Sequence, residues 1–400
     1  MDQISQTGPQ FSLLSNPQSS TLRRAQSLAG PLAAAADEIE RSRRIPEPLL
    51  SQLHGSGLFR MLLPSDLGGG EVAPGDYVRA VEEVARHDAS VAWNIFVGNS
   101  SALIAPYIGE ETAREIFTDP RTIIAWGPPH TGLADAVAGG YRVSGTWDFA
   151  SGCRQANWMG VHCRVKETDG SLRLNALGQP TIRTLLFPRD QATLHDTWDT
   201  IGLRGTASDS YSIDDLFIAE AYSGTRDDPR LRRKSGPLYA FPQQTLYTVG
   251  VAAVALGIGR AMLEAFMKLA AEKTPRGLSR LADTGSVQAG VAKGEATLGA
   301  ARAYLLAALG DVYDRAGDTD PIDIPDRARV RLAATHAIHG ASDITDWVYK
   351  AAGVSAIFPG TPFERRFRDM HTLTQQIQAR SSHYETAGQV LLGSPPEVYF

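Results

Sequence analysis

The chain has 400 residues, of which 43% are hydrophobic and 21% are charged, the balance of an ordinary globular enzyme. The net charge of −5 gives no reason to expect nucleic acid or an anionic membrane as a partner. The two cysteines, Cys153 and Cys163, form no disulfide framework, which favours a reducing, cytoplasmic setting.

The N-terminal segment changes character after its first twenty residues. Residues 1–20 are rich in Ser, Gln and Pro and lack the pattern of a signal peptide, so we expect a disordered tail. Residues 21–120 show helical spacing of apolar residues and predict an N-terminal helical domain. The clearest helical runs are 22–32, 76–102 and 110–117.

Residues 121–225 predict a β domain. Short alternating runs are divided by Gly, Pro and Asp at the spacing of an antiparallel sandwich or barrel. The expected strands are 123–126, 141–143, 159–165, 183–187 and 211–218.

The most informative stretch of this region is GGYRVSGTWDFASGCRQANW, residues 139–158. It predicts a hairpin that turns at Ser144–Gly145, with a second strand that carries Phe149 and ends at Ser151. A hydroxyl group and a free backbone N–H beside aromatic side chains can hold one edge of a flat, polar heteroaromatic ring.

The charged segment 226–234 predicts an exposed domain boundary, and residues 240–400 are helical again. Apolar residues recur every seven positions, which is typical of a helix in a bundle. These residues are Val291, Leu298, Leu305 and Val312. The longest apolar run, 249–259, is too short to span a membrane.

Several common enzyme classes lack their motifs. The sequence contains no G-x-S-x-G elbow, no P-loop, no G-x-G-x-x-G after a strand and no His/Cys cluster with metal-ligand spacing.

The order of elements and four motifs resemble the acyl-CoA dehydrogenase superfamily. The motifs are LLPSDLGGGE (62–71), the strand that ends at Ser151, GLRGTASDSYSIDDLFI (202–218) and RRFRDMHTLTQQ (365–376). The resemblance implies an α+β fold, with an N-terminal helical domain, a central antiparallel β-sandwich or barrel, and a C-terminal four-helix bundle. It also implies a bound flavin and a homotetramer.

The resemblance further implies roles for individual residues. Phe149 takes the place of the aromatic beside the isoalloxazine, and Ser151 that of the hydroxyl bonded to flavin N(5). Trp126 ends a strand whose following loop, with His130, lies at the flavin edge in relatives. Arg276 takes roughly the place of an arginine that reaches the flavin pyrophosphate of a neighbouring subunit.

The superfamily contains two chemistries, and the residues here favour the second. Dehydrogenases need a glutamate base at one of two places. One of these places holds Gln376–Ile377, and the other lies in the stretch between Asp228 and Glu264, which contains no carboxylate. The resemblance is closer to two-component monooxygenases, in which a separate reductase supplies reduced FMN or FAD and the enzyme uses molecular oxygen on a small apolar or aromatic substrate.

Many relatives of that second kind have a catalytic histidine where Gln376 stands, and another where residues 99–101 stand. Glutamine can donate a hydrogen bond but cannot shuttle a proton. The candidates for proton transfer are therefore His371, His130 and His383.

Two alternatives stay open at this point. The first is an acyl-CoA dehydrogenase with an unrecognised base, for which Glu385 is the nearest candidate in sequence. The second is a non-catalytic flavin-binding protein of the same fold.

Overall fold

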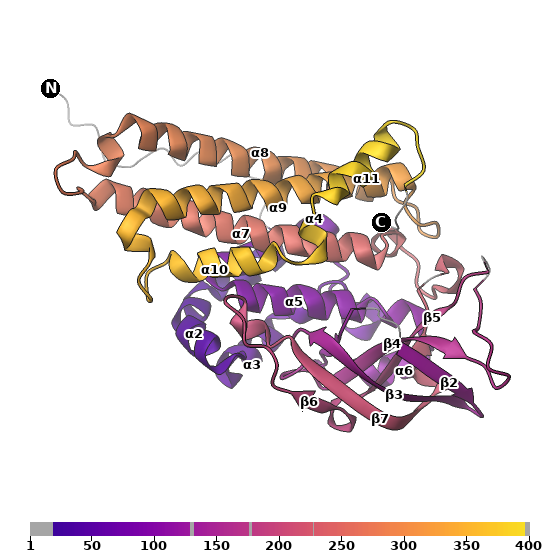
Figure 1. Ribbon diagram of the computed structural model, residues 1–400. Helices are drawn as coiled ribbons and strands as arrows, with labels where there is room; N and C mark the ends of the chain where they lie inside the picture. The colour runs from indigo at the N-terminus through magenta and orange to yellow at the C-terminus, as the bar shows by residue number, and fades with distance from the viewer. Residues whose placement is uncertain (1–18, 129–131, 176–177, 227, 397–400) are drawn as a thin grey trace.

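The computed structural model describes residues 19–128, 132–175, 178–226 and 228–396 (Figure 1). Helices come first, a β-sheet follows, and long helices complete the chain, which confirms the predicted α+β order. Most of the predicted disordered tail lies outside the described residues, and the first described helix begins at Ser20.

The N-terminal helices include one, α5, that is buried on all sides. They are α1 Ser20–Ser27, α2 Ala29–Ser42, α3 Glu47–Ser56, α4 Pro74–His87, α5 Ala89–Ala102 and α6 Glu110–Phe117. The predicted run 76–102 is two helices, because Asp88 is extended and its carboxylate accepts a hydrogen bond from Val91 N at 2.8 Å. Every residue of α5 is buried, and the helix lies between the sheet and the C-terminal bundle (Figure 1).

The strands form one mixed sheet. They are β1 Ile124–Trp126, β2 Gly132–Val137, β3 Gly140–Ala150, β4 Trp158–Lys166, β5 Ile182–Pro188, β6 Thr193–His195, β7 Asp209–Ala219 and β8 Ser223–Gly224. Their order is β6-β7-β3-β2-β4-β5-β8, with β1 beside β4. The prediction of an antiparallel domain is wrong for β1 and β2, which both run parallel to β4. Strand β3 pairs with β2 on one edge and with β7 on the other. Strand β4 therefore pairs with the remaining free edge of β2, where it runs parallel to β2.

The predicted hairpin turn at Ser144–Gly145 is also wrong. The strand β3 continues through these residues, and the chain reverses before it, next to Gly139, which has φ 79°. A register shift against β7 accommodates the Ser–Gly pair. A Cβ at position 145 would lie 2.8 Å from the Trp147 ring, so this glycine makes room for an aromatic side chain within a strand.

The C-terminal region consists of long helices. They are α7 Gln243–Glu272, α8 Gly285–Arg315, α9 Ile324–Ala352, α10 Glu364–Leu373 and α11 Ser382–Leu391, with the 3-10 turn η11 Ile377–Ala379 before α11. Leu298, Leu305 and Val312 of the predicted seven-residue pattern are buried. Helix α7 is long and apolar enough to cross a membrane, but 89% of its most apolar window is buried within the protein, as in a core helix.

Small residues let α7 approach its neighbours closely. A Cβ at Gly257 would lie 2.5 Å from Ala85 Cβ of α4, and a Cβ at Gly250 would lie 2.7 Å from the Phe96 ring of α5. The glycines of α7 therefore set its distance from the N-terminal helices.

Replacing Gly257 with alanine should destabilise the protein by about 1–3 kcal/mol, because the added methyl group forces α7 and α4 apart. Gly310→Ala is the matched control: it lies within α8 with no atom within 4 Å of the new Cβ. The control should be neutral or stabilise by up to about 1 kcal/mol. Urea unfolding measures both, and an equal loss in the two variants would contradict the packing argument.

Candidate functional site

The loop of residues 202–208 joins the sheet to both sets of helices. A Cβ at Gly202 would lie 2.6 Å from Asp369 N of α10, and a Cβ at Gly205 would lie 2.9 Å from Ser90 Cβ of α5. The GLRGT motif therefore needs glycine at both positions, because the loop backbone is in direct contact with its neighbours. In addition, Asn94 Nδ2 donates to Gly205 O at 3.0 Å.

Asp369 fixes the same loop from the bundle side. Its buried carboxyl group accepts a hydrogen bond from Leu203 N at 2.6 Å. Burial, together with the nearby carboxylates of Asp88 and Glu40, raises the pKa of Asp369 to about 7, against the opposing effects of the Leu203 hydrogen bond and Arg368. Asp369 is thus a buried acid that holds the loop next to α10.

The loop brings two hydroxyl groups to the end of β3, and their hydrogen bonds run in one direction. Leu203 O can only accept, so Thr206 Oγ1 donates to it at 2.8 Å. Each hydroxyl has one proton, so Ser208 donates to Thr206 at 2.8 Å, and Ser151 donates to Ser208 at 2.6 Å. Trp93 Nε1 donates to Ser151 Oγ at 3.1 Å. The remaining lone pair of Ser151 is therefore available only as an acceptor.

Phe149 lies beside this hydroxyl group and is exposed. It adopts φ 62° at the second register shift of β3, a conformation that is rare for a large side chain and is typical of functional sites. Its side chain is 58% exposed and meets the Trp198 ring edge-on, with 6.2 Å between centroids. Phe149 thus offers a free aromatic face next to Ser151.

Unpaired amide groups lie near the same place. Asn94 Oδ1 and both polar side-chain atoms of Gln155 are buried without a hydrogen-bond partner among the described residues. A Cβ at Gly152 would lie 3.3 Å from Asn94 Oδ1 and 3.7 Å from Gln155 Nε2, so both amides border the residue after Ser151. Buried unpaired groups are uncommon and indicate a ligand or ordered water. An acceptor hydroxyl, a free aromatic face and unpaired amides together fit a flavin ring.

An aromatic wall connects Ser151 to Gln376. On α5, Trp93 and Phe96 pack edge to face with 4.8 Å between centroids, and Phe96 meets Tyr247 of α7 at 5.1 Å. The Tyr247 hydroxyl is hydrogen-bonded to the side chain of Gln376. The structure therefore brings Ser151 and Gln376, two residues predicted from the sequence, to the two ends of one wall.

The local geometry of Gln376 fixes its amide. Gln376 precedes η11, and its Oε1 accepts a hydrogen bond from Gln378 N at 2.6 Å. Burial raises the pKa of Tyr247, so the phenol stays protonated at neutral pH.

Two histidine candidates, His371 and His383, are engaged by other groups. His371 Nε2 lies 2.9 Å from Asp346 Oδ1 of α9, and its ring packs on Phe367 at 4.2 Å. His383 Nε2 lies 2.8 Å from Ile377 O. His130 lies outside the described residues.

Asn99 is one of the residues 99–101, where the resemblance implies a second histidine, and it has a structural role. Its Oδ1 accepts from Leu62 N at 3.0 Å, and its Nδ2 donates to Leu58 O at 2.7 Å and to Ile95 O at 2.8 Å. All its hydrogen-bonding groups are thus used to hold α5 against the preceding segment.

Arg276 is exposed in the connection between α7 and α8. It follows the C-terminal end of α7, whereas Tyr247 lies in the first turns of that helix. A helix of 30 residues is about 45 Å long. Within one chain Arg276 is therefore far from the aromatic wall and takes no part in it.

Trp126 lies beside a cavity of about 480 Å³ between β4, β5 and the first turn of α7. Arg226 lies over the Trp126 ring at 5.2 Å, and His162 meets this ring edge-on at 5.0 Å. Gln243 accepts a hydrogen bond from Arg226 and donates to Ser100 O at 3.0 Å. The predicted linker is thus anchored at its first residue, and the cavity is large enough for a small aromatic molecule.

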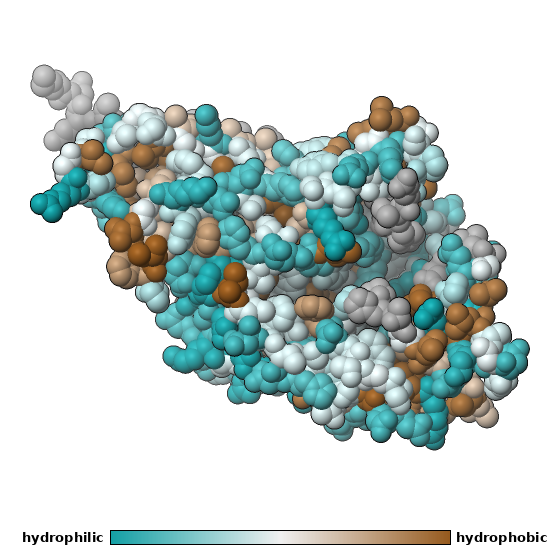
Figure 2. Space-filling model, in the orientation of Figure 1, coloured by the Kyte–Doolittle hydropathy of each residue, from teal (hydrophilic) through white to brown (hydrophobic). Residues whose placement is uncertain are grey.

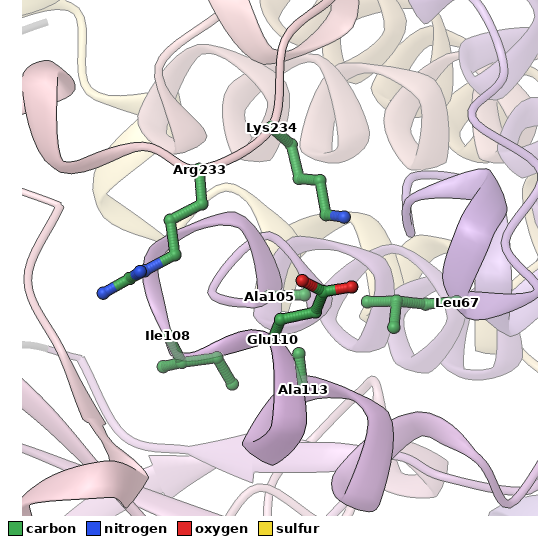
Figure 3. Close-up of a pocket in the computed structure, with 7 residues that line it drawn as sticks. All are labelled: Leu67, Ala105, Ile108, Glu110, Ala113, Arg233 and Lys234. Carbon is green, nitrogen blue, oxygen red and sulfur yellow. The ribbon is translucent and has the colours of Figure 1, made fainter.

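A second pocket, of about 120 Å³, lies between α6 and the linker (Figure 3). Its Glu110 is paired with Arg114, and its Lys234 with Asp66. This pocket is smaller than typical ligand sites and lies on elements that contribute nothing to the aromatic wall.

Sequence reasoning missed the residues that complete the wall. Tyr247 carries no motif, and Thr206 and Ser208 lay in a recognised motif without an assigned role. The one available signal for Tyr247 was its position, as an aromatic residue in the first turns of a helix that is otherwise rich in small residues.

Replacing Asp369 with asparagine should flatten the pH dependence of stability. The folded-state pKa of about 7 exceeds the unfolded value of 3.8, so the folded protein binds the proton more tightly and stability falls as pH rises through this range. Asparagine keeps an acceptor for Leu203 N but does not titrate. Urea midpoints at pH 5 and pH 8 measure the difference, and an unchanged slope in Asp369→Asn would remove Asp369 from this role.

Comparison with known proteins places the chain in a family. Residues 23–117 match the acyl-CoA dehydrogenase N-terminal domain, and residues 249–380 match the acyl-CoA dehydrogenase C-terminal domain. An indole-3-acetate monooxygenase from Pseudomonas putida is 30% identical over 370 residues, which cover 91% of each chain. The oxygenase subunit HsaA of a flavin-dependent monooxygenase from Rhodococcus jostii is 26% identical, over 88% of this chain and 92% of that one.

Solved structures share the fold. XiaF from Streptomyces sp., in complex with FADH2 and glycerol, superposes with a TM-score of 0.86 at 22% identity, over 95% of this chain and 96% of that one. FMN-bound TdsC from Paenibacillus sp. A11-2 gives a TM-score of 0.78 at 19% identity, over 94% and 98%. The chain therefore belongs to the acyl-CoA dehydrogenase superfamily, in its branch of flavin-dependent monooxygenases.

Proposed function

We propose that this protein is the oxygenase component of a two-component monooxygenase that hydroxylates a small aromatic substrate. It would take reduced FMN or FAD from a separate reductase, use molecular oxygen, and work as a cytoplasmic homotetramer in which Arg276 serves a neighbouring subunit. The observation that carries this proposal is the aromatic wall from Ser151 to Gln376. The names of relatives point the same way, since they specify indole-3-acetate and resorcinol.

Reduced flavin, when bound, supplies the electrons that activate oxygen. The protein has to orient the ring and exclude water. Ser151 presents an acceptor to N(5), which carries a hydrogen in reduced flavin and none in oxidised flavin. The one-directional hydroxyl chain therefore favours binding of the reduced cofactor.

At the other end of the wall, Gln376 offers an amide to oxygen or to substrate, while the partly buried Tyr247, which packs on the buried Phe96, provides apolar surface for an aromatic ring. The dehydrogenase alternative has less support. Its candidate base Glu385 is exposed on α11, and neither Tyr247 nor Gln376 can remove a proton from a thioester at neutral pH.

Rapid mixing tests the function. The protein is incubated anaerobically with reduced FMN or FAD and then mixed with oxygen. We expect a transient absorbance distinct from those of reduced and oxidised flavin, and hydroxylation of an aromatic substrate such as indole. Rapid bleaching of oxidised flavin by an acyl-CoA thioester would contradict the proposal and favour the dehydrogenase.

Thr206→Val should reduce the preference for reduced flavin. Without the threonine acceptor, Ser208 donates to Ser151, whose own proton becomes free to bond oxidised N(5). The ratio of the two flavin dissociation constants should fall by about 2- to 12-fold, the value of one neutral hydrogen bond. Thr200→Val is the control, since Thr200 Oγ1 donates to Gly202 O and takes no part in the hydrogen-bonded series of hydroxyl groups. Equal ratios of the two dissociation constants in wild type and Thr206→Val would contradict this mechanism.

Gln376→Ala should increase hydrogen peroxide release without product, because Gln378 N and the Tyr247 hydroxyl lose their partner at a cost of about 1–3 kcal/mol. Flavin binding should change little. Gln376→His should add an ionisation near 6.5 to the pH profile of product formation, shifted by burial. Oxygen and product assays measure both variants, and full coupling in Gln376→Ala would reduce Gln376 to a packing residue.

A further inference from the structure

Arg331 of α9 is a buried cation that has no carboxylate partner among the described residues. It is 3% exposed, and Nη1 donates to Gln378 Oε1, which also accepts from Thr248 Oγ1 at 2.9 Å. Burial lowers the pKa of Arg331 to about 10, and no neighbouring acid raises it, so the guanidinium is charged at neutral pH. A buried charge that only neutral groups contact is costly unless a ligand supplies the opposite charge.

The groups around Arg331 are basic as well. Arg331, Arg380 and His339 all lower the pKa of His383, which shows that these side chains share one region. His339 Nε2 lies 2.8 Å from Ala379 O, next to η11. The region where α9, α11 and η11 meet therefore holds several basic groups, and its nearby acid is Asp343 of α9, which raises the pKa of Tyr384 together with burial.

Arg331 is linked to the aromatic wall in two ways, through a hydrogen bond of its partner Gln378 and through the position of Thr248 in the sequence. Its partner Gln378 donates its backbone N–H to Gln376 Oε1 at 2.6 Å, and Thr248 directly follows Tyr247 in α7. Arg331 is thus close to the Gln376 end of the wall, which is the end away from Ser151.

The cavity of about 480 Å³ lies one helical turn away along both helices. Arg327 of α9 and Gln244 of α7 line it, and these residues precede Arg331 and Thr248 by four positions. Thr248 Oγ1 also lies 2.8 Å from Gln244 O. The described lining of the cavity includes Arg226, Arg232 and Arg327 and no Asp or Glu. The lining of this neighbouring cavity therefore adds no negative charge next to Arg331.

We infer that Arg331 is a specificity residue that pairs with a carboxylate on the aromatic substrate, so that this enzyme prefers aromatic acids over their neutral analogues. This inference rests on the proposed function. The flavin phosphate is the other possible source of an anion. The substrate is favoured because Arg331 lies at the Gln376 end of the wall, whereas the N(5) edge belongs at Ser151.

Calorimetric binding tests the inference. Indole-3-acetate and indole-3-acetamide, which share a ring and differ in charge, are titrated anaerobically into the protein with reduced FMN. Wild type should bind the acid at least about tenfold more tightly than the amide, and Arg331→Met should lose this difference. Arg329→Met is the control, because Arg329 lies on the same helix and pairs with Asp311 on the surface.

A second variant separates charge pairing from folding. Gln378→Glu gives Arg331 an internal carboxylate, so it should abolish the preference for the acid while the protein keeps its thermal stability. Equal affinity of wild type for acid and amide, or binding of neither, would overturn the inference. So would weaker FMN binding in Arg331→Met with an intact acid preference, which would assign Arg331 to the flavin phosphate. Hydroxylation of neutral indole tests the proposed function separately, since indole needs no partner for Arg331.

Discussion

The close contact of one loop with two helices, α5 and α10, is the constraint on which the site depends. Gly202 touches the backbone of α10 and Gly205 touches α5, while Asp369 and Asn94 hydrogen-bond the loop backbone. The loop then positions the hydroxyl groups next to β3. Any side chain at either glycine would move these hydroxyls by more than a hydrogen bond tolerates, so the packing of the bundle determines the chemistry at the end of the sheet.

The protein maintains this arrangement at a cost in stability. Two buried acids, Asp369 and Asp88, have their pKa values raised to about 7 and about 6, and each destabilises the folded state when ionised. Phe149 adopts a strained backbone conformation, and Asn94 Oδ1 and the Gln155 amide have no hydrogen-bond partner among the described residues. Such features gather where a protein binds and reacts, and all of them lie around the end of β3 or the loop that supports it.

Sequence periodicity predicted the order of helices and strands because it depends on local contacts alone. Strand pairing depends on distant segments, which is why the parallel pairs of β4 were missed. A turn was predicted at Ser144–Gly145, where the strand in fact has a bulge, because small and polar residues are typical of both turns and bulges. Ser151 and Gln376 could be found from motif positions. His371 could not be excluded in that way, since its partner Asp346 lies on another helix.

The two places at which the resemblance implies a histidine, residues 99–101 and Gln376, differ in their surroundings. Asn99 uses its amide hydrogens and its carbonyl oxygen in packing. Gln376 remains at the wall but does not titrate, and the pKa of neighbouring Tyr247 is raised by burial. The hydroxyl chain from Ser151 ends at a backbone carbonyl, which can accept a hydrogen bond but cannot pass a proton onward. Among the described residues, the wall therefore offers fixed dipoles rather than titrating groups, and in the proposed reaction protons would leave through the substrate or solvent.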